Sequence, residues 1–161
     1  MPHIASLTSL ESPWVHTALG GADISPAVSA ISQGSGRVVH FDGGLMQNAN
    51  DLFREYSRGF QFPEYFGWNW NAFHECMTEL EGLPARAYLT VISNADLLLV
   101  ENGQDLQIYL SQLDSIGSTW SRSFALGPAW GGGEVPFNTV FLGGKDWVER
   151  FGREGSIISA S

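Results

Sequence analysis

Three short runs of β-branched and aromatic residues mark the predicted strands of this chain. They are residues 37–42 (RVVHFD), 88–92 (YLTVI) and 138–142 (NTVFL), and a Gly-Gly pair closes the first and the last. Runs of this kind, bounded by turn residues, are typical of β-strands. Helical patterns separate the three runs, so we predict an α/β fold with a small three-stranded parallel sheet and crossover helices.

Apolar residues recur at helical spacing after the first predicted strand. This stripe consists of Leu52, Phe53, Tyr56 and Phe60. Asn50 is the candidate N-cap of the helix, because its side chain can accept a hydrogen bond from a free backbone N–H. Gly59 and Pro63 bound the helix on its other side.

A second helix is predicted from about Asn69 to Glu81, and its residues separate into two stripes. The apolar stripe consists of Trp70, Phe73, Met77 and Leu80, which are spaced three, four and three residues apart. Asn71, Glu75 and Thr78 form a polar stripe on another face, and His74 flanks it. The spacing therefore predicts one face that packs on a core and one polar face.

The segments between and after these elements are less regular. Asn102-Gly103 predicts a turn before a helical stripe that consists of Leu106, Tyr109, Leu110, Leu113 and Ile116. Asp96 is expected to cap a short helical turn over residues 97–99. Residues 117–136 contain Gly127-Pro128 and a run of three glycines, which predicts a long loop before the last strand. Residues 145–152 predict a short closing helix.

The first 36 residues are rich in Ser, Ala and Gly, and we interpret them as an N-terminal extension to a domain of residues 37–161. Within them, residues 12–19 are expected to hold a short strand or anchor, and residues 21–36 an extension or linker. The whole chain has 161 residues, which is enough for one ordinary domain.

The chain carries a net negative charge, and its acidic and basic residues are unevenly distributed. The formal net charge is −9, and Arg86 is the only Lys or Arg between residues 61 and 116, a stretch that holds eight acidic residues. This balance argues against a nucleic acid as direct ligand, because phosphate binding needs clustered Lys and Arg. It favours a basic protein partner, while a merely solvated acidic surface is the alternative.

Other features bear on compartment and chemistry. A single cysteine, Cys76, excludes an internal disulfide, and no secretory signal or membrane-spanning run is visible, so we expect a soluble, cytoplasmic protein. On a helix, His74 and Cys76 point about 200° apart, so this pair does not form a nucleophile and its base. The histidines and the cysteine lack the spacing of a metal site, and Gly131–Gly133 lacks the Lys of a phosphate-binding loop.

An aromatic loop precedes the second helix. Tyr65, Phe66, Trp68 and Trp70 lie within six residues, and aromatic side chains are frequent anchors of protein interfaces. We expect Trp70 in the core, Tyr65 or Phe66 in the core as well, and Trp68 exposed. Gly67 permits a positive φ or the close approach of a partner backbone.

The stretch from Phe62 to Leu80 resembles the loop and second helix of the barstar family, intracellular inhibitors of barnase-type ribonucleases. The matching residues are Pro63-Glu64-Tyr65-Phe66-Gly67, Asn69, Ala72, Cys76 and Thr78. Element order extends the resemblance over about residues 37–143, and Glu101-Asn102-Gly103 adds to it. The resemblance implies a protein inhibitor, not an enzyme, that needs no cofactor. It implies that acidic side chains imitate RNA phosphate in the active site of a basic extracellular or toxin-type ribonuclease. It further implies that the chain is an immunity protein and that it is a monomer when no enzyme is bound.

The resemblance also implies a set of partner-binding positions. Glu75 matches the acid that enters the enzyme most deeply, and the other implied contacts are Tyr65, Gly67, Asn69, Trp70, Asn71, His74 and Thr78. To these we add Trp68, because we expect it to be exposed in the loop.

Several positions depart from the family pattern. Glu75 replaces an Asp, Asn71 lacks the charge of a second carboxylate, and His74 replaces an aromatic residue. Leu113 stands where a later helix carries an acid, and the adjacent Asp114 is rotated by about 100°. These changes indicate a target other than barnase itself. A non-inhibitory interaction module with the same fold is the alternative, and a thiol enzyme using Cys76 is a third, weaker one.

Overall fold

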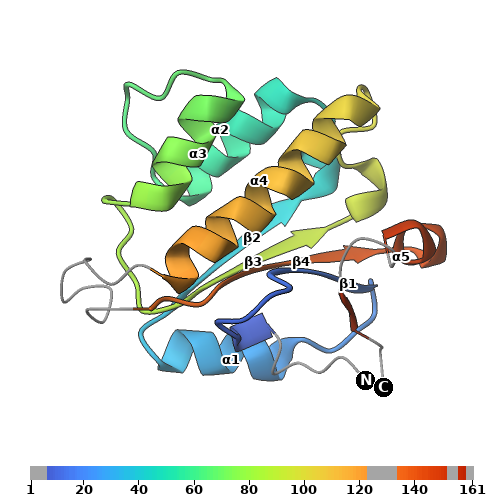
Figure 1. The fold of residues 1–161 in the computed structure, drawn as a ribbon. Helices are drawn as coiled ribbons and strands as arrows, with labels where there is room; N and C mark the ends of the chain where they lie inside the picture. Colours follow the sequence, from blue (N-terminus) through green and yellow to red (C-terminus); the bar gives the residue numbers. More distant parts are fainter. Residues whose placement is uncertain (1–6, 123–133, 152–155, 159–161) are drawn as a thin grey trace.

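The computed structural model describes residues 7–122 and 134–151 and the backbone of residues 156–158. These ranges form a five-stranded sheet in the order β2-β3-β4-β1-β5, in which every neighbouring pair is parallel (Figure 1). The strands are β1 (Val15–Leu19), β2 (Arg37–Asp42), β3 (Tyr88–Ser93), β4 (Phe137–Gly143) and β5 (Ser156–Ile158). The helices are α1 (Ser25–Gln33), α2 (Ala49–Gly59), α3 (Trp70–Glu79), α4 (Gly103–Ser121) and α5 (Lys145–Phe151), with 3-10 turns η2 (Gly43–Leu45) and η3 (Ala95–Leu97).

The parallel α/β architecture with crossover helices is confirmed, but the prediction of three strands was wrong. The predicted strands correspond to β2, β3 and β4, which lie side by side. The sheet continues through β1, which pairs with β4 on one side and β5 on the other. Four successive residues of β1, from Val15 to Ala18, are buried. A parallel strand buried on both faces needs a neighbour on each side, and the neighbours β4 and β5 come from the distant end of the chain.

The N-terminal region contains regular structure. The expected short strand within residues 12–19 is confirmed as β1. The segment 21–36 was expected as an extension or linker, yet it contains α1. Helix α1 buries Ala27 and Ile31 in a cluster with Leu89, Val91 and Val140 of the sheet. The division of the chain into an extension and a domain stays a prediction.

The helices lie on both faces of the sheet, unequally distributed. Helices α2, α3 and α4 cover one face and α1 lies on the other (Figure 1). The larger core is rich in aromatic rings, and Tyr56, Phe73 and Tyr109 pack edge to face within it. The hydroxyl groups of Tyr56 and Tyr109 hydrogen-bond each other, which satisfies two buried polar atoms. Burying each large apolar side chain stabilises the fold by about 1.5–3 kcal/mol.

Several element boundaries differ from the predicted ones. Asn48, not Asn50, caps α2, because its Oδ1 accepts a hydrogen bond from the N–H of Asp51. Asp96 does not cap η3; it accepts a hydrogen bond from the N–H of Gly144 instead.

The predicted loop over 117–136 was wrong at its start, because α4 continues to Ser121. Residues 123–133, including the glycine run, lie outside the described residues. The closing helix is confirmed as α5. Within the described ranges, every helix is too short or too polar to cross a bilayer.

Candidate partner-binding surface

Helix α3 begins and ends at residues that fix its orientation. The Oδ1 of Asn69 accepts a hydrogen bond from the N–H of Ala72 at 2.8 Å and so caps the helix. Leu80 ends it in the left-handed conformation, with φ at 46°. The helix buries Phe73, Cys76 and Met77 beneath it. The opposite side is exposed, and we call Asn71, Glu75 and Glu79 on that side the outer face of α3.

The aromatic loop separates into buried and exposed rings. Phe66 is only 5% exposed and packs edge to face on Phe53 and Phe62, whereas Tyr65 is 76% exposed. Trp68 is 48% exposed, as predicted, and lies against Phe66. Trp70 is partly buried against the core, which confirms its predicted packing role. Phe66, rather than Tyr65, is therefore the core residue of the loop.

The backbone of this loop is strained at one aromatic residue. Trp68 has a φ of 53°, in the left-handed region that a bulky side chain rarely adopts. Gly67 was the residue expected to permit a positive φ, but its own φ lies outside the left-handed region. Strained positions of this kind concentrate at binding sites, where the surrounding structure holds them in place. The strained backbone thus coincides with a side chain that is nearly half exposed.

Tyr65 lies close to the carboxylates of α3. Partial desolvation of its hydroxyl raises the pKa of Tyr65, and the negative charges of Glu79 and Glu81 raise it further, with smaller effects from Cys76 and Glu75. Because three quarters of the Tyr65 side chain is exposed, its raised pKa chiefly indicates that negative charges lie near its hydroxyl. In the described part of the chain, none of these glutamates forms an ion pair; the ion pairs there lie on α2 and α5. Among the described residues, the outer face of α3 is therefore an acidic surface whose carboxylates form no ion pair.

Polar contacts join the other side of α3 to α4. The Nε2 of His74 lies 3.0 Å from the Oγ of Ser115, and the Nε1 of Trp70 donates to Asp105 at 3.4 Å. Thr78 is turned back onto its own helix, because its hydroxyl donates to the carbonyl of His74 at 2.8 Å. Asp105 thus lies beside the predicted contact residues of α3.

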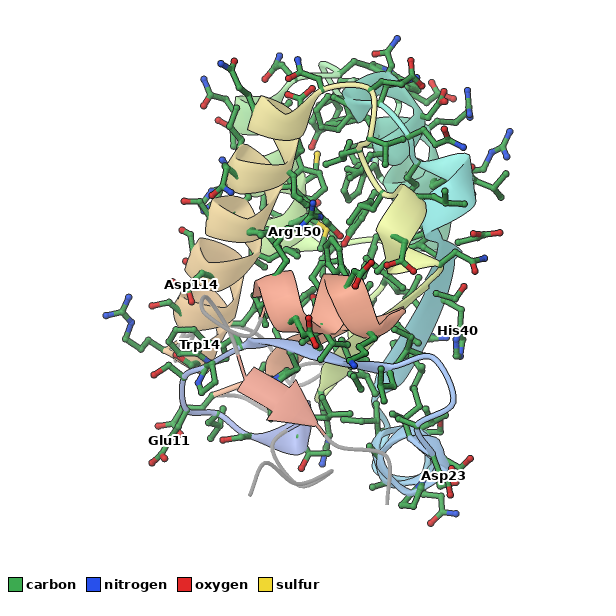
Figure 2. The ribbon with its side chains drawn as sticks, turned by 90° about the vertical axis from the view of Figure 1, so that its right-hand side faces the viewer. Glu11, Trp14, Asp23, His40, Asp114 and Arg150 are labelled. Atoms are coloured by element: carbon green, nitrogen blue, oxygen red, sulfur yellow. The ribbon has the colours of Figure 1, made fainter. Side chains whose placement is uncertain are left out.

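The later acidic residue of α4 points elsewhere. Asp114 lines a hollow with Pro13, Val15 and Phe151 on the side of α4 away from α3. Figure 2 shows Asp114 on the same side of the molecule as Trp14 and Glu11. Leu113 is only 2% exposed and belongs to the core. Of the nine predicted contact residues, four lie in the loop that leads into α3, and the other five lie on α3 itself.

The thiol of Cys76 lacks the surroundings of a nucleophile. It is 6% exposed, and burial raises its pKa, with the charges of Glu79 and Glu75 adding to the effect. A catalytic thiol needs a lowered pKa and a base within reach, and His74 contacts Ser115 instead. Among the described residues, no group of three or more His, Cys, Asp or Glu could hold a metal ion.

The family model described as Barstar (barnase inhibitor) matches residues 36–137 of the chain. The chain belongs to the barstar family. The match runs from just before β2 to the first residue of β4, so it includes the aromatic loop and α3. Barstar proteins are inhibitors of ribonucleases rather than enzymes. A comparison with curated proteins found no significant match.

Two carboxylates near Tyr65 were missed by the sequence reasoning. Glu79 follows Glu75 by four residues and so continues the same helical face, a spacing that could have revealed it. Glu81 comes after the end of α3, and only the path of the chain brings it toward Tyr65. Asp105 was likewise hidden from the sequence pattern, since its contact with Trp70 joins two helices.

Proposed function

We propose that this barstar-family protein binds a basic ribonuclease and blocks its active site with the outer face of α3 and the aromatic loop. The observation that carries the proposal is the proximity of Glu75, Glu79 and Glu81 to the exposed Tyr65, without a cation of the described chain beside them. Such a surface complements a cleft lined by Lys and Arg. Family membership supports a ribonuclease as the partner.

The proposed mechanism is imitation of the substrate's charge. A ribonuclease holds RNA phosphates with cations, and Glu75 lies at the middle of the outer face, where its carboxylate can replace a phosphate. Tyr65 and Trp68 flank α3 as exposed aromatic anchors, which are the residue types that supply much of the binding energy at interfaces. The proposed contacts are Tyr65, Gly67, Trp68, Asn69, Trp70, Asn71, His74, Glu75 and Thr78, together with the carboxylates of Glu79 and Glu81 beside Tyr65.

The biological role that follows is that of an immunity protein. A monomeric inhibitor in the cytoplasm would protect a producing cell from its own secreted or toxin-type ribonuclease. The net charge of −9 would speed the capture of a basic enzyme by electrostatic steering.

The test is inhibition of purified basic microbial ribonucleases. We expect loss of activity at a molar ratio of one to one and a matching stoichiometry in calorimetry. If stoichiometric protein leaves every enzyme of the barnase-like class active and calorimetry detects no binding, the proposed function is wrong.

A non-inhibitory interaction module is the second candidate. It is favoured by Asn71, which has no charge, and by Leu113, which is buried where the family resemblance leads one to expect an acid. The same assay distinguishes the two candidates. Binding to a basic protein that retains full nuclease activity would support the module and exclude the inhibitor.

A further inference from the structure

A pocket of about 360 Å³ opens beside the outer face of α3. It lies between the start of the aromatic loop and the residues that follow α3. Its lining residues share an unusual combination of aromatic rings and carboxylates: Phe60, Phe62, Tyr65, Glu79 and Glu81. The other lining residues are Gln61, Pro63, Cys76, Leu80 and Gly82.

The rims of this pocket are held in place by the backbone. Gln61 has a φ of 56° and Leu80 a φ of 46°, so both rims contain a residue in the left-handed region. A Cβ on Gly82 would come within 2.9 Å of the carbonyl oxygen of Gln61, which shows that the two rims touch. The backbone therefore fixes both rims of the pocket, while exposed side chains such as Tyr65 form part of its wall.

The pocket carries two carboxylates and a free thiol in its wall. In the described part of the chain, Glu79 and Glu81 form no ion pair. Cys76 is 6% exposed, and its thiol forms no disulfide. An anion would be repelled here, and a bare metal ion would lack the three ligands it needs.

We propose that this pocket receives the guanidinium group of an arginine side chain from a protein partner. A guanidinium stacks on the aromatic rings of Tyr65 and Phe62 through its flat face. Its N–H groups, which lie in one plane, donate to carboxylates, and Glu79 and Glu81 lie on the pocket wall. The identity of the partner rests on the proposed function, whereas the preference for a guanidinium rests on the pocket alone.

The first experiment uses the free protein and a small probe. N-acetyl-arginine amide is titrated while the amide signals of Tyr65 and Gly82 are followed by NMR. N-acetyl-citrulline amide has nearly the same shape without the charge and serves as the matched probe. We expect saturable shifts with the arginine probe, with a dissociation constant on the order of 10 mM, and none with the citrulline probe. Equal shifts with both probes, or none with either, would overturn the proposal.

The second experiment uses a ribonuclease that the wild-type protein inhibits. The double variant Glu79→Gln/Glu81→Gln is compared with Glu11→Gln/Glu134→Gln, which changes the net charge equally at exposed positions outside the pocket. We expect the first variant to lose about tenfold or more in affinity and the second to lose less than about threefold. Equal losses would mean that the pocket receives no cation. If no ribonuclease binds the wild-type protein, the proposed function fails, and the arginine titration still decides on the pocket.

Discussion

His16 of β1 and Asn138 of β4 form a hydrogen bond between two neighbouring strands inside the protein. The Nε2 of His16 lies 2.8 Å from the Oδ1 of Asn138, and the Nδ2 of Asn138 donates to the carbonyl of Ser9. Both side chains are fully buried. Asn138 of β4 thus contacts both β1 and the residues before it, which are far from β4 in the sequence.

We predict that protonation of His16 destabilises the fold. Burial lowers the pKa of His16, and the hydrogen bond with Asn138 opposes this only in part. The unfolded chain therefore binds a proton at a higher pH than the folded chain does. The stability that the neutral, buried His16 contributes is fully present above pH ~6.5, the ordinary pKa of histidine. As the pH falls below this value, the free energy of unfolding decreases by at most about 1.4 kcal/mol per pH unit for one proton.

Urea unfolding at several pH values between neutral and mildly acidic measures this effect. The variant His16→Gln should flatten the dependence, while His40→Gln, at an exposed position, should retain it. An unaltered pH dependence in His16→Gln would show that another group is responsible.

Gly117→Ala should destabilise the protein, although Ala normally improves a helix by about 1 kcal/mol over Gly. A Cβ at this buried position in α4 would lie 2.4 Å from the Cβ and Cγ of Trp14. These atoms lie near the backbone and cannot swing away, so the fit of residue 14 against α4 would be lost. We expect a net cost of about 1 kcal/mol or more from overpacking.

The matched control is Gly103→Ala in the same helix, where a Cβ would meet nothing within 4 Å. Its free energy of unfolding should change by less than about 0.5 kcal/mol or rise slightly. Similar behaviour of the two variants would mean that Trp14 contributes nothing to the packing of α4.

The sequence predicted local elements well and spatial neighbours poorly. The stripe of Trp70, Phe73 and Met77 turned inward as its spacing required, and Trp68 turned outward. The place of β1 between β4 and β5 was not predictable, because pairing between distant segments leaves no periodic pattern in either one. The proximity of Glu81 to Tyr65 depends on the path of the chain between the loop and the residues after α3. The residues of the surface could therefore be found, but not the pocket beside them.

The proposed function predicts a salt-dependent association rate. An acidic surface steers a basic enzyme over distances of about 10 Å at 0.1 M salt, and added salt screens this attraction. We expect the association rate constant to fall about tenfold or more between about 0.05 M and 0.5 M salt, while the dissociation rate changes less. Stopped-flow mixing measures both. An association rate constant that does not change with salt concentration would indicate an interface dominated by the aromatic side chains of Tyr65 and Trp68.

The last prediction separates the role of Glu75 in binding from any role in folding. Glu75 is exposed on the outer face of α3, away from Phe73 and Met77, which fill the core. Glu75→Gln should therefore change the free energy of unfolding by less than about 0.5 kcal/mol.

Binding to the ribonuclease should respond much more strongly. If the carboxylate enters a cleft of cations, its loss leaves these cations dehydrated and unpaired, which costs about 2–5 kcal/mol, a range that draws on the barnase–barstar pair itself. A carboxylate at the rim would cost less than about 1 kcal/mol. Glu11→Gln, at an exposed position on the same side of the molecule as Asp114 (Figure 2), controls for the change in net charge. An unchanged dissociation constant for Glu75→Gln would remove Glu75 from the site. A large loss of stability would make Glu75 a structural residue, because only a buried or paired carboxylate stabilises the fold to that extent.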